Sequence, residues 1–283
     1  MTVFGPHQAL GTIWYVECFS DIDEDQLATF VTDYLETFES RYSRFRSDSW
    51  LSVLNQTGEF KSPDPEFVAL LRQGQSSYEA TNGIFNIAVG ERMNASGYDS
   101  QYSFTASDVI PAVPALETTL KVQDEKITLT NGQLDLGGYA KGFCIDRLAE
   151  KLESDLDCTH FLVNGGGDMY VSSDNDKAVE IALAHPTQPG ESIGTVLLKD
   201  QGFAASSPHV RAWTDAKTNE TQNHLLSEAA VASYVVAEDA ATADVWATAA
   251  SIDREIQTPQ SIEMLLVDEE QIIKTTETFL LNT

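Results

Sequence analysis

Apolar positions along the chain change repeatedly between the alternation of a strand and the wider spacing of a helix. Residues 9–19 (ALGTIWYVECF) predict an opening strand. The next stretch, 24–39, predicts an amphipathic helix, because its apolar residues recur three and four positions apart on one helical face. These residues are Leu27, Phe30, Val31, Tyr34, Leu35 and Phe38. The chain is therefore expected to begin with a strand followed by a helix.

Turn and cap residues divide the rest of the first half. A short helix is expected to carry Leu51 and Leu54 and to end near Asn55. Pro65 predicts the first turn of another helix, where proline is tolerated. Thr81-Asn82-Gly83 predicts the end of that helix, since Asn and Gly accept the left-handed backbone conformation that is common there.

The second half predicts more strands than helices. Asn131-Gly132 stands between ITLT and QLDL and predicts a hairpin turn. Helices are expected over 143–155 and 241–252, and strands over 160–163, 178–184, 194–199 and 231–237, with a final hairpin-like pair over 262–281. This mixture predicts an α+β fold of mixed or antiparallel sheets with packed helices. We expect a single domain over 1–283, with a surface excursion around 91–118.

Charge restricts the classes of partner. The chain has 44 acidic and 17 basic residues among 283, a formal net charge of −27. Nucleic-acid phosphates and anionic membrane surfaces are recognised by clustered Lys and Arg, of which this chain has few, so neither is an expected partner. Hydrophobic residues make up 42% of the chain. That share is enough for a full core and excludes an acidic disordered protein.

Signals for a cellular compartment are sparse. No apolar run reaches the ~18 residues of a transmembrane helix, and the start MTVFGPHQALGTIWYVE carries no signal-peptide pattern. Cys18, Cys144 and Cys158 show no CxxC spacing and are expected to be buried thiols in a reducing compartment. We expect a cytoplasmic protein, or a periplasmic or membrane-anchored one if a leader was removed from the chain.

The first candidate for chemistry is the loop 41–49, which holds Arg41, Arg44 and Arg46 among serines and aromatic residues. Arginine and hydroxyl groups suit a phosphate, and aromatic rings suit a planar group. The same cations also suit the negative end of the preceding helix. The loop therefore has two interpretations, a phosphate site and a helix terminus.

Two glycine-rich segments follow strands. Asp135-Leu136-Gly137-Gly138-Tyr139-Ala140-Lys141-Gly142 leads into a helix, which is a natural place for an anion. It has neither the GK[ST] of a P-loop nor the GxGxxG of a dinucleotide fold. Asn164-Gly165-Gly166-Gly167-Asp168 allows a ligand to approach the backbone closely. Each segment also fits an ordinary turn.

Asp244 and Thr248 are four residues apart on the helix expected over 241–252, so they share one face. A carboxylate and a hydroxyl are hard oxygen ligands, which suit Mg²⁺ with water and substrate phosphate as further ligands. The alternative is a helix-terminal acid favoured by the dipole. No GxSxG element or Cys/His pairing supports a hydrolase.

Taken in order, these segments resemble the ApbE-like FAD:protein FMN transferase family. The matching segments span nearly the whole chain, namely 11–12, 43–55, 81–90, 135–146, 164–168 and 243–249. The resemblance implies an ApbE-like, T-fold-like architecture with FAD as substrate and Mg²⁺ at its diphosphate. It also implies transfer of FMN to a Thr or Ser hydroxyl of an acceptor flavoprotein, with release of AMP.

The resemblance also implies roles for individual residues. The metal ligands would be the Ala140 carbonyl, Asp244 and Thr248, and the catalytic residues would be His224 and Asp244. Phe45 and Phe85 would lie near the rings of FAD. The implied FAD-binding residues are Ser43, Phe45, Ser49, Phe85, Asn86, Asp135, Gly137, Gly138, Lys141, Asp146, Gly166, Gly167 and Asp168.

Departures from the family pattern fall mainly on the acceptor side. His224 is followed by Leu-Leu-Ser-Glu, where the family has Asp-Pro, and residues 205–208 read Ala-Ser-Ser-Pro in place of a Thr-Ser-Gly turn. Phe45 and Asn86 replace a tyrosine and an aspartate. Two alternatives therefore stay open, a Mg²⁺-dependent FAD pyrophosphatase giving FMN and AMP, and a non-catalytic FAD-binding protein.

Overall fold

The computed structural model describes residues 1–99, 103–173, 177–208, 212–215, 217–218, 221–225, 231–268 and 271–282. The chain divides into two compact units, which are described separately. Unit 1 comprises Met1–Thr37, Tyr139–His209 and Ala229–Thr283, and unit 2 comprises Phe38–Gly138 and Val210–Glu228. The single domain expected over 1–283 stays a prediction.

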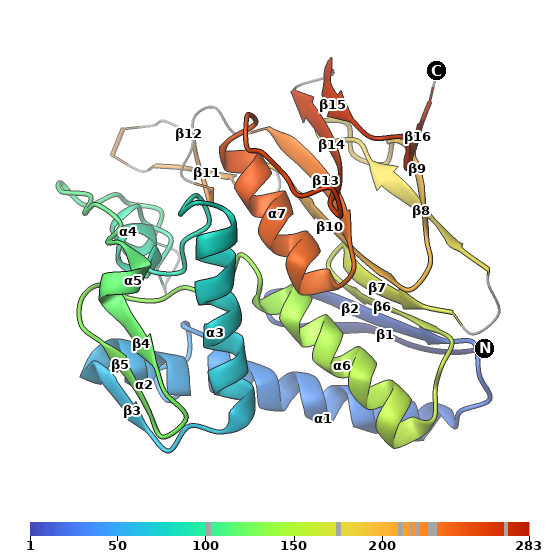
Figure 1. The fold of residues 1–283 in the computed structure, drawn as a ribbon, viewed down its shortest axis with the longest axis horizontal. Helices are drawn as coiled ribbons and strands as arrows, with labels where there is room; N and C mark the ends of the chain where they lie inside the picture. The colour runs from blue at the N-terminus through green and yellow to red at the C-terminus, as the bar shows by residue number, and fades with distance from the viewer. Residues whose placement is uncertain are drawn as a thin grey trace. The chain divides into compact units, whose positions relative to one another are not determined.

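Unit 1 is built on a sheet of eight strands with antiparallel neighbours. In spatial order the strands are β1 (Thr2–Ala9), β2 (Thr12–Cys18), β6 (Phe161–Gly165), β7 (Asp168–Ser172), β10 (Gln201–Ser206), β13 (Ala232–Ala237), β14 (Glu263–Asp268) and β15 (Gln271–Thr275). Helices α6 (Ala140–Leu156) and α7 (Ala240–Ile252) cover one face of this sheet (Figure 1). Helix α1 (Glu24–Tyr42) begins in unit 1 and ends in unit 2.

A second, three-stranded sheet belongs to the same unit. Its order is β16 (Phe279–Leu281), β9 (Ser192–Leu198) and β8 (Val179–Ala184). Val196, Leu198 and Phe279 from this sheet join Tyr234 and Val236 from β13 in one buried apolar cluster. The other face of β13 meets α7, where Ser233 Oγ donates to the Ala247 carbonyl (2.6 Å). All six residues of β13 are buried because both faces of that strand are covered.

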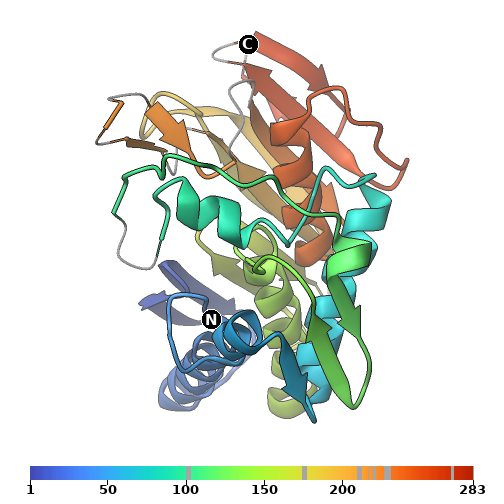
Figure 2. The ribbon, with the colours of Figure 1, turned by 90° about the vertical axis from the view of Figure 1, so that its left-hand side faces the viewer.

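Unit 2 combines helices with short strands. The helices are α2 (Trp50–Thr57), α3 (Pro65–Ala80), α4 (Gly90–Ala95) and α5 (Leu116–Thr119). One sheet has the order β3 (Glu59–Lys61), β5 (Lys126–Leu129), β4 (Leu120–Val122), and another pairs β11 (Ala212–Thr214) with β12 (Thr221–Asn223). Helix α3 runs alongside the β3-β5-β4 sheet in both views (Figures 1 and 2).

The expected α+β class is confirmed, and so is most of the element order. The opening strand expected over 9–19 is the second arm of a hairpin whose first arm, β1, the sequence did not reveal. Leu10 (φ 53°) and Gly11 (φ 72°) form its two-residue turn, and positive φ at both turn residues matches the twist of the arms. Within the described ranges, none of the helices combines the length and apolar character that a membrane span requires.

The hairpin predicted at Asn131-Gly132 is wrong. Strand β5 lies between β3 and β4, and residues 133–136 do not pair with it. They find other partners, among them the Asn55 amide, which accepts from the Leu134 N–H (2.8 Å) and donates to the Leu134 carbonyl (2.9 Å). A distant side chain therefore replaces the local strand partner that the turn signal predicts.

Asp215 provides a test of unit 2 through pH. Hydrogen bonds from the amides of Thr218, Ala106 and Lys217 lower the pKa of Asp215 to about 2. Because the folded pKa lies below the unfolded value of about 3.9, this carboxylate stabilises the fold above pH ~4, and the stabilisation is lost as the pH falls toward 2. We expect Asp215→Asn to lower the urea midpoint at pH 7, and the difference from wild type to narrow between pH 4 and pH 3.

The matched control is Asp108→Asn, since the Asp108 side chain is 95% exposed and pairs with the Lys217 ammonium at the surface (3.0 Å). We expect its midpoint to follow wild type within error at every pH. A difference in urea midpoint between wild type and Asp215→Asn that stays constant down to pH 3 would contradict this. It would show that the three amides do not favour the charged form of the Asp215 carboxyl.

Candidate functional site

In unit 1 the N-termini of α6 and α7 lie in direct contact. Gly142, in the first turn of α6, packs against the backbone of Ala240 and Ala241 so closely that a Cβ at this position would overlap it. Only glycine allows this approach. The contact places Lys141 of α6 beside Asp244 of α7.

A lysine and two aspartates form the centre of this site, which we call the unit 1 cluster: Lys141, Asp168 and Asp244. The Lys141 ammonium contacts Asp168 directly and lies 3.1 Å from Asp244 Oδ2. The amide of Gly142 donates to the same Asp244 oxygen (3.3 Å). The side chains are 15%, 3% and 7% exposed, respectively. The structure thus brings together one residue from each of the segments 135–142, 164–168 and 242–248.

The cluster carries more negative than positive charge. Burial raises the pKa of Asp244 to about 7, Lys141 acts in the opposite direction, and the charge of Asp168 raises it further. One ammonium cannot neutralise two buried carboxylates, and uncompensated buried charge is costly. The site is therefore electrostatically suited to a further cation.

Donor chemistry agrees with that conclusion. Asp244 is buried, and Thr248 lies one helical turn further along α7 and is half-buried. Among the described residues, no group of three or more His, Cys, Asp or Glu is placed to hold a metal ion. The carboxylate of Asp244 and the hydroxyl of Thr248 are hard oxygen donors that fit Mg²⁺, which is commonly held by one or two carboxylates together with waters and substrate phosphates. It does not fit Zn²⁺, which prefers His and Cys ligands.

The glycine turn after β6 shapes the edge of this cluster. Gly166 (φ 76°) and Gly167 (φ 101°) both adopt the left-handed conformation. Gly166 packs directly against the Thr12 side chain, whereas the space beside Gly167 is open. Asn164 fixes the turn by accepting from the Gly167 amide (2.9 Å). The backbone at Gly167 is therefore approachable, while Gly166 is required for packing, and ligand binding at this turn stays a prediction.

Asp146 has a structural partner in α7. Its two carboxylate oxygens accept from the amides of Ala240 (2.8 Å) and Ala241 (2.9 Å), while Asp239 caps the same helix through the Thr242 amide (2.6 Å). Burial and the charge of Asp239 raise the pKa of Asp146 to about 7. These hydrogen bonds hold the N-terminus of α7 against α6. Contact between Asp146 and FAD stays a prediction.

In unit 2 a second buried cation ties three segments together. The Arg44 guanidinium lies 2.6 Å from Asp135 Oδ2 and donates to Asn94 Oδ1 (2.8 Å) and the Tyr98 carbonyl (2.6 Å). It also stacks on the Phe45 ring, 4.2 Å from its centroid. The Arg44 and Asp135 side chains are only 8% and 10% exposed. Each of the three guanidinium nitrogens therefore has a partner within unit 2.

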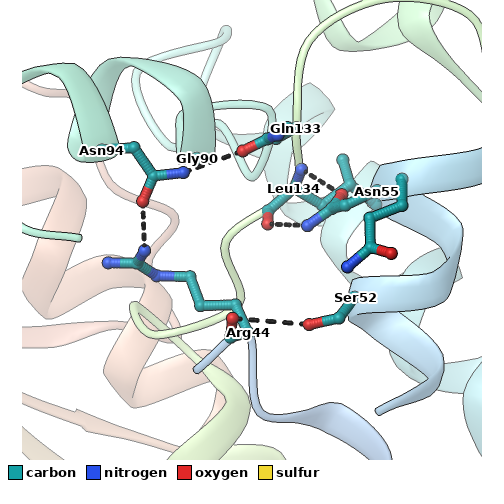
Figure 3. Close-up of a pocket in the computed structure, with 8 residues that line it drawn as sticks. Arg44, Ser52, Asn55, Gly90, Asn94, Gln133 and Leu134 are labelled. Atoms are coloured by element: carbon teal, nitrogen blue, oxygen red, sulfur yellow. Dashed lines mark hydrogen bonds between the residues drawn. The ribbon is translucent and has the colours of Figure 1, made fainter. Parts of the chain in front are cut away.

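Figure 3 shows a small cavity beside Arg44, with Asn94 and Gln133 hydrogen-bonded across it (2.8 Å) and Ser52 on the opposite side. Its volume is about 100 Å³. Small-molecule sites usually exceed ~300 Å³, so this cavity is too small for a dinucleotide. It marks the interior of the Arg44 network.

Asp135 organises the turn that precedes α6 in the sequence. While Oδ2 faces Arg44, Oδ1 accepts from the Gly137 amide (2.7 Å). Both oxygens are thus used within unit 2, and the shape of the Gly137-Gly138 turn depends on them. Direct contact between Asp135 and FAD stays a prediction.

The other arginines of the loop also face carboxylates of the chain. Arg41, in the last turn of α1, pairs with Asp64 (3.0 Å) and stacks on Trp50 at 4.6 Å. Arg46 lies 3.5 Å from Asp48 at the surface. Of the two interpretations of this loop, the position of Arg41 matches the helix terminus.

The remaining predicted residues of unit 2 occupy both buried and exposed positions. Ser49 is fully buried, caps α2 by accepting from the Ser52 amide (3.0 Å) and donates to the Ser43 carbonyl (2.7 Å). Ser43 Oγ in turn accepts from the Phe45 amide (3.3 Å). Phe45 is 38% exposed, which leaves part of its ring available to a ligand.

Phe85 and Asn86 lie in the segment after α3. Phe85 is 4% exposed. Asn86 donates to the Pro114 carbonyl (2.9 Å) and accepts from the Ala88 amide (2.9 Å). His224 lies half-buried in the turn after β12. The departure noted after His224 includes Leu226, Ser227 and Glu228, which lie outside the described residues.

Sequence reasoning missed the partners that hold these sites in place. Asn94 and Tyr98 lie in the expected surface excursion, yet they bind Arg44. Asp239 was missed as the cap of α7. An aspartate directly before a helical pattern is a recognisable capping signal, whereas nothing in the sequence indicates the contacts of Asn94 and Tyr98.

Comparison with known proteins gives consistent matches. The ApbE family model matches residues 10–268. The FAD:protein FMN transferase of Haemophilus influenzae is 25% identical over 224 residues, which are 71% of this chain and 64% of that protein. That of Rhodobacter capsulatus is 26% identical over 230 residues, 74% of this chain and 43% of that protein. The matches thus span less than two thirds of the length of these relatives.

Solved structures share the fold. The ApbE protein of Thermotoga maritima superposes with a TM-score of 0.79 at 22% identity and covers 96% of each chain. The apo form of the Pseudomonas stutzeri flavinyl transferase ApbE gives a TM-score of 0.77 at 19% identity, covering 98% of this chain and 94% of that one.

Arg44 provides a test of the unit 2 network. Arg44→Lys keeps the charge but has no planar fork, so the bonds to Asn94 and the Tyr98 carbonyl cannot be kept together with the Asp135 pair. We expect a loss of about 2 kcal/mol in the free energy of unfolding, because buried hydrogen bonds to a charged donor are lost while the positive charge stays beside Asp135. Urea denaturation measures it, with Arg46→Lys at the surface as the matched control. Equal midpoints for the two variants would contradict the network.

Proposed function

Because the chain belongs to the ApbE family, we propose that it transfers FMN from FAD to a threonine or serine hydroxyl of an acceptor flavoprotein, with Mg²⁺ as cofactor and AMP as the leaving product. The observation that carries this proposal is the unit 1 cluster of Lys141, Asp168 and Asp244 at the N-termini of α6 and α7. The cluster combines a cation, an unneutralised carboxylate and helix amides, which are the groups that handle a diphosphate.

Mg²⁺ would be held by Asp244, Thr248 and the Ala140 carbonyl. When bound there, it would neutralise the diphosphate and stabilise the leaving AMP. The residues of the chain then have separate tasks. Lys141 positions a phosphate oxygen with its ammonium group, and the open space beside Gly167 lets the ligand approach the backbone. Phosphoryl transfer depends mainly on such positioning and charge neutralisation.

The acceptor hydroxyl must lose its proton as it attacks phosphorus. An imidazole is the side chain best matched to this task near neutral pH, and we propose His224 as the general base. Among the predicted FAD contacts of unit 2, we propose Phe45 above all, because part of its ring is exposed. Gly138 and Phe85 are proposed on the family pattern alone.

The deciding experiment incubates the protein with FAD, Mg²⁺ and an acceptor domain that carries a target threonine. Flavin fluorescence that stays with the acceptor band after denaturing electrophoresis supports the transferase. Free FMN and AMP without labelled acceptor would indicate the pyrophosphatase, which the altered segment after His224 keeps as the second candidate. Recovery of unchanged FAD would indicate a binding protein.

Asp244→Asn tests the metal assignment. The amide is similar in size but lacks the charge, so we expect the Mg²⁺-dependent transfer rate to fall at least 100-fold, the range found when transition-state charge stabilisation is lost. Calorimetric titration with Mg²⁺ in the presence of FAD should lose its binding signal as well. The control is Asp268→Asn, a half-exposed carboxylate of the same unit. Wild-type Mg²⁺ affinity in Asp244→Asn would overturn the assignment.

His224→Ala tests the general base. We expect the transfer rate at saturating FAD to fall by about 100-fold or more, as for loss of a general base, while the dissociation constant for FAD stays near the wild-type value. His185→Ala in unit 1 serves as the control. A weaker FAD affinity with an unchanged rate per bound FAD would assign His224 to binding instead.

A further inference from the structure

Two of the three cysteines meet at the end of α6 that lies opposite the unit 1 cluster. Cys18 is the last residue of β2, and Cys158 lies between α6 and β6. They are 140 positions apart in the sequence, so the fold alone brings them together. Both are fully buried, and none of the three cysteines takes part in a disulfide.

The strand register explains their proximity. Cys18 lies opposite Phe161 in the β2–β6 pair, and the Phe19 amide donates to the His160 carbonyl (2.9 Å). The short loop before β6 therefore passes beside the end of β2. Within it, the Cys158 thiol lies beside Ser20, two residues after Cys18, and close enough to the Cys18 thiol for each to shift the pKa of the other.

The surroundings make the two sulfur atoms unequal. Cys158 Sγ lies 3.9 Å from Ser20 Oγ and 3.8 Å from the His160 carbonyl oxygen. The hydrogen bond from Cys18, together with that of Ser20, lowers the pKa of Cys158, whereas the same contact and burial raise the pKa of Cys18. Cys158 is therefore the better nucleophile of the pair, since the thiolate is the reactive form.

We propose that Cys18 and Cys158 are an oxidisable pair that hydrogen peroxide converts to a disulfide, with Cys158 as the thiol that reacts first. The Cys158 thiolate attacks one peroxide oxygen, which forms an S–O bond and breaks the O–O bond. Hydroxide leaves and becomes water with the proton lost by the thiol. The product is a sulfenic acid on Cys158.

Cys18 completes the reaction. Its sulfur attacks Cys158 Sγ, the S–O bond breaks, and the hydroxyl leaves as water with the Cys18 proton. In sum, two thiols lose two electrons and one peroxide becomes two waters. Peroxide is the fitting oxidant because both thiols are fully buried. A compact oxidant needs a smaller opening of the loop before β6 than a glutathione-sized disulfide does.

The third cysteine provides an internal comparison. Cys144 is fully buried too, but it lies within the first turns of α6. Its helical backbone opens less readily than a loop. The pairing therefore predicts selective oxidation of Cys18 and Cys158, with Cys144 left as a thiol.

The test treats the full chain with hydrogen peroxide, alkylates the remaining thiols in denaturant, and analyses a non-reduced digest by mass spectrometry. We expect a cross-linked peptide that joins Cys18 to Cys158, a mass lower by two hydrogen atoms, an alkylated Cys144, and full reversal by dithiothreitol. Equal oxidation of all three cysteines, or oxidation of Cys158 to a sulfinic acid without the cross-link, would overturn the proposal.

Single variants define the order of the steps. In Cys18→Ser, the sulfenic acid on Cys158 should persist and be trapped by dimedone, whereas Cys144→Ser should form the disulfide as wild type does. Dimedone labelling of Cys18 in Cys158→Ser at the rate seen for Cys158 in Cys18→Ser would overturn the assignment of the first step. The wild-type cross-link tests the pairing even if a variant fails to fold.

Discussion

The contact between Gly142 of α6 and the first residues of α7 is the constraint on which the unit 1 site depends. Because the two helices approach to backbone contact, Lys141 reaches both Asp168 and Asp244. Asp146 then accepts the α7 amides that this approach would otherwise leave unsatisfied. A side chain at position 142 would separate the helices and remove the lysine from its carboxylates. The close packing at Gly142 therefore also determines which carboxylates compensate the charge of Lys141.

The buried cations of the two units differ in the number of carboxylates that surround them. In unit 1, one lysine faces two buried carboxylates, which leaves a negative excess suited to a cation. In unit 2, the charge of Arg44 is balanced by Asp135, and its two terminal nitrogens donate to Asn94 and to the Tyr98 carbonyl. Both residues are notable from composition alone, because the chain has only 17 basic residues and 44 acidic ones. The candidate site and the structural pair therefore differ in the number of carboxylates around the cation.

Expectations from the sequence held where the signal was local. The helix expected over 24–39 exists as α1, and Asp244 and Thr248 lie on α7 as their spacing predicted. They failed where a distant group replaced a local partner. Asn131-Gly132 has the strongest short-range hairpin signal, yet the segment after it pairs with Asn55 instead. Strand β1 was missed because its Gly and Pro interrupt the alternation that marks a strand.

By itself, the sequence determined the α+β class, most helices and the candidate segments, because periodicity, caps and glycine turns act over a few residues. It could not determine which of these segments meet. The cluster of Lys141, Asp168 and Asp244 joins residues up to 103 positions apart, and the contact between Cys18 and Cys158 spans the strand pair β2–β6. Such contacts between distant residues depend on strand order and on how closely helices pack. These are properties of the whole fold, since burial and hydrogen bonding are satisfied across the chain and not within one segment.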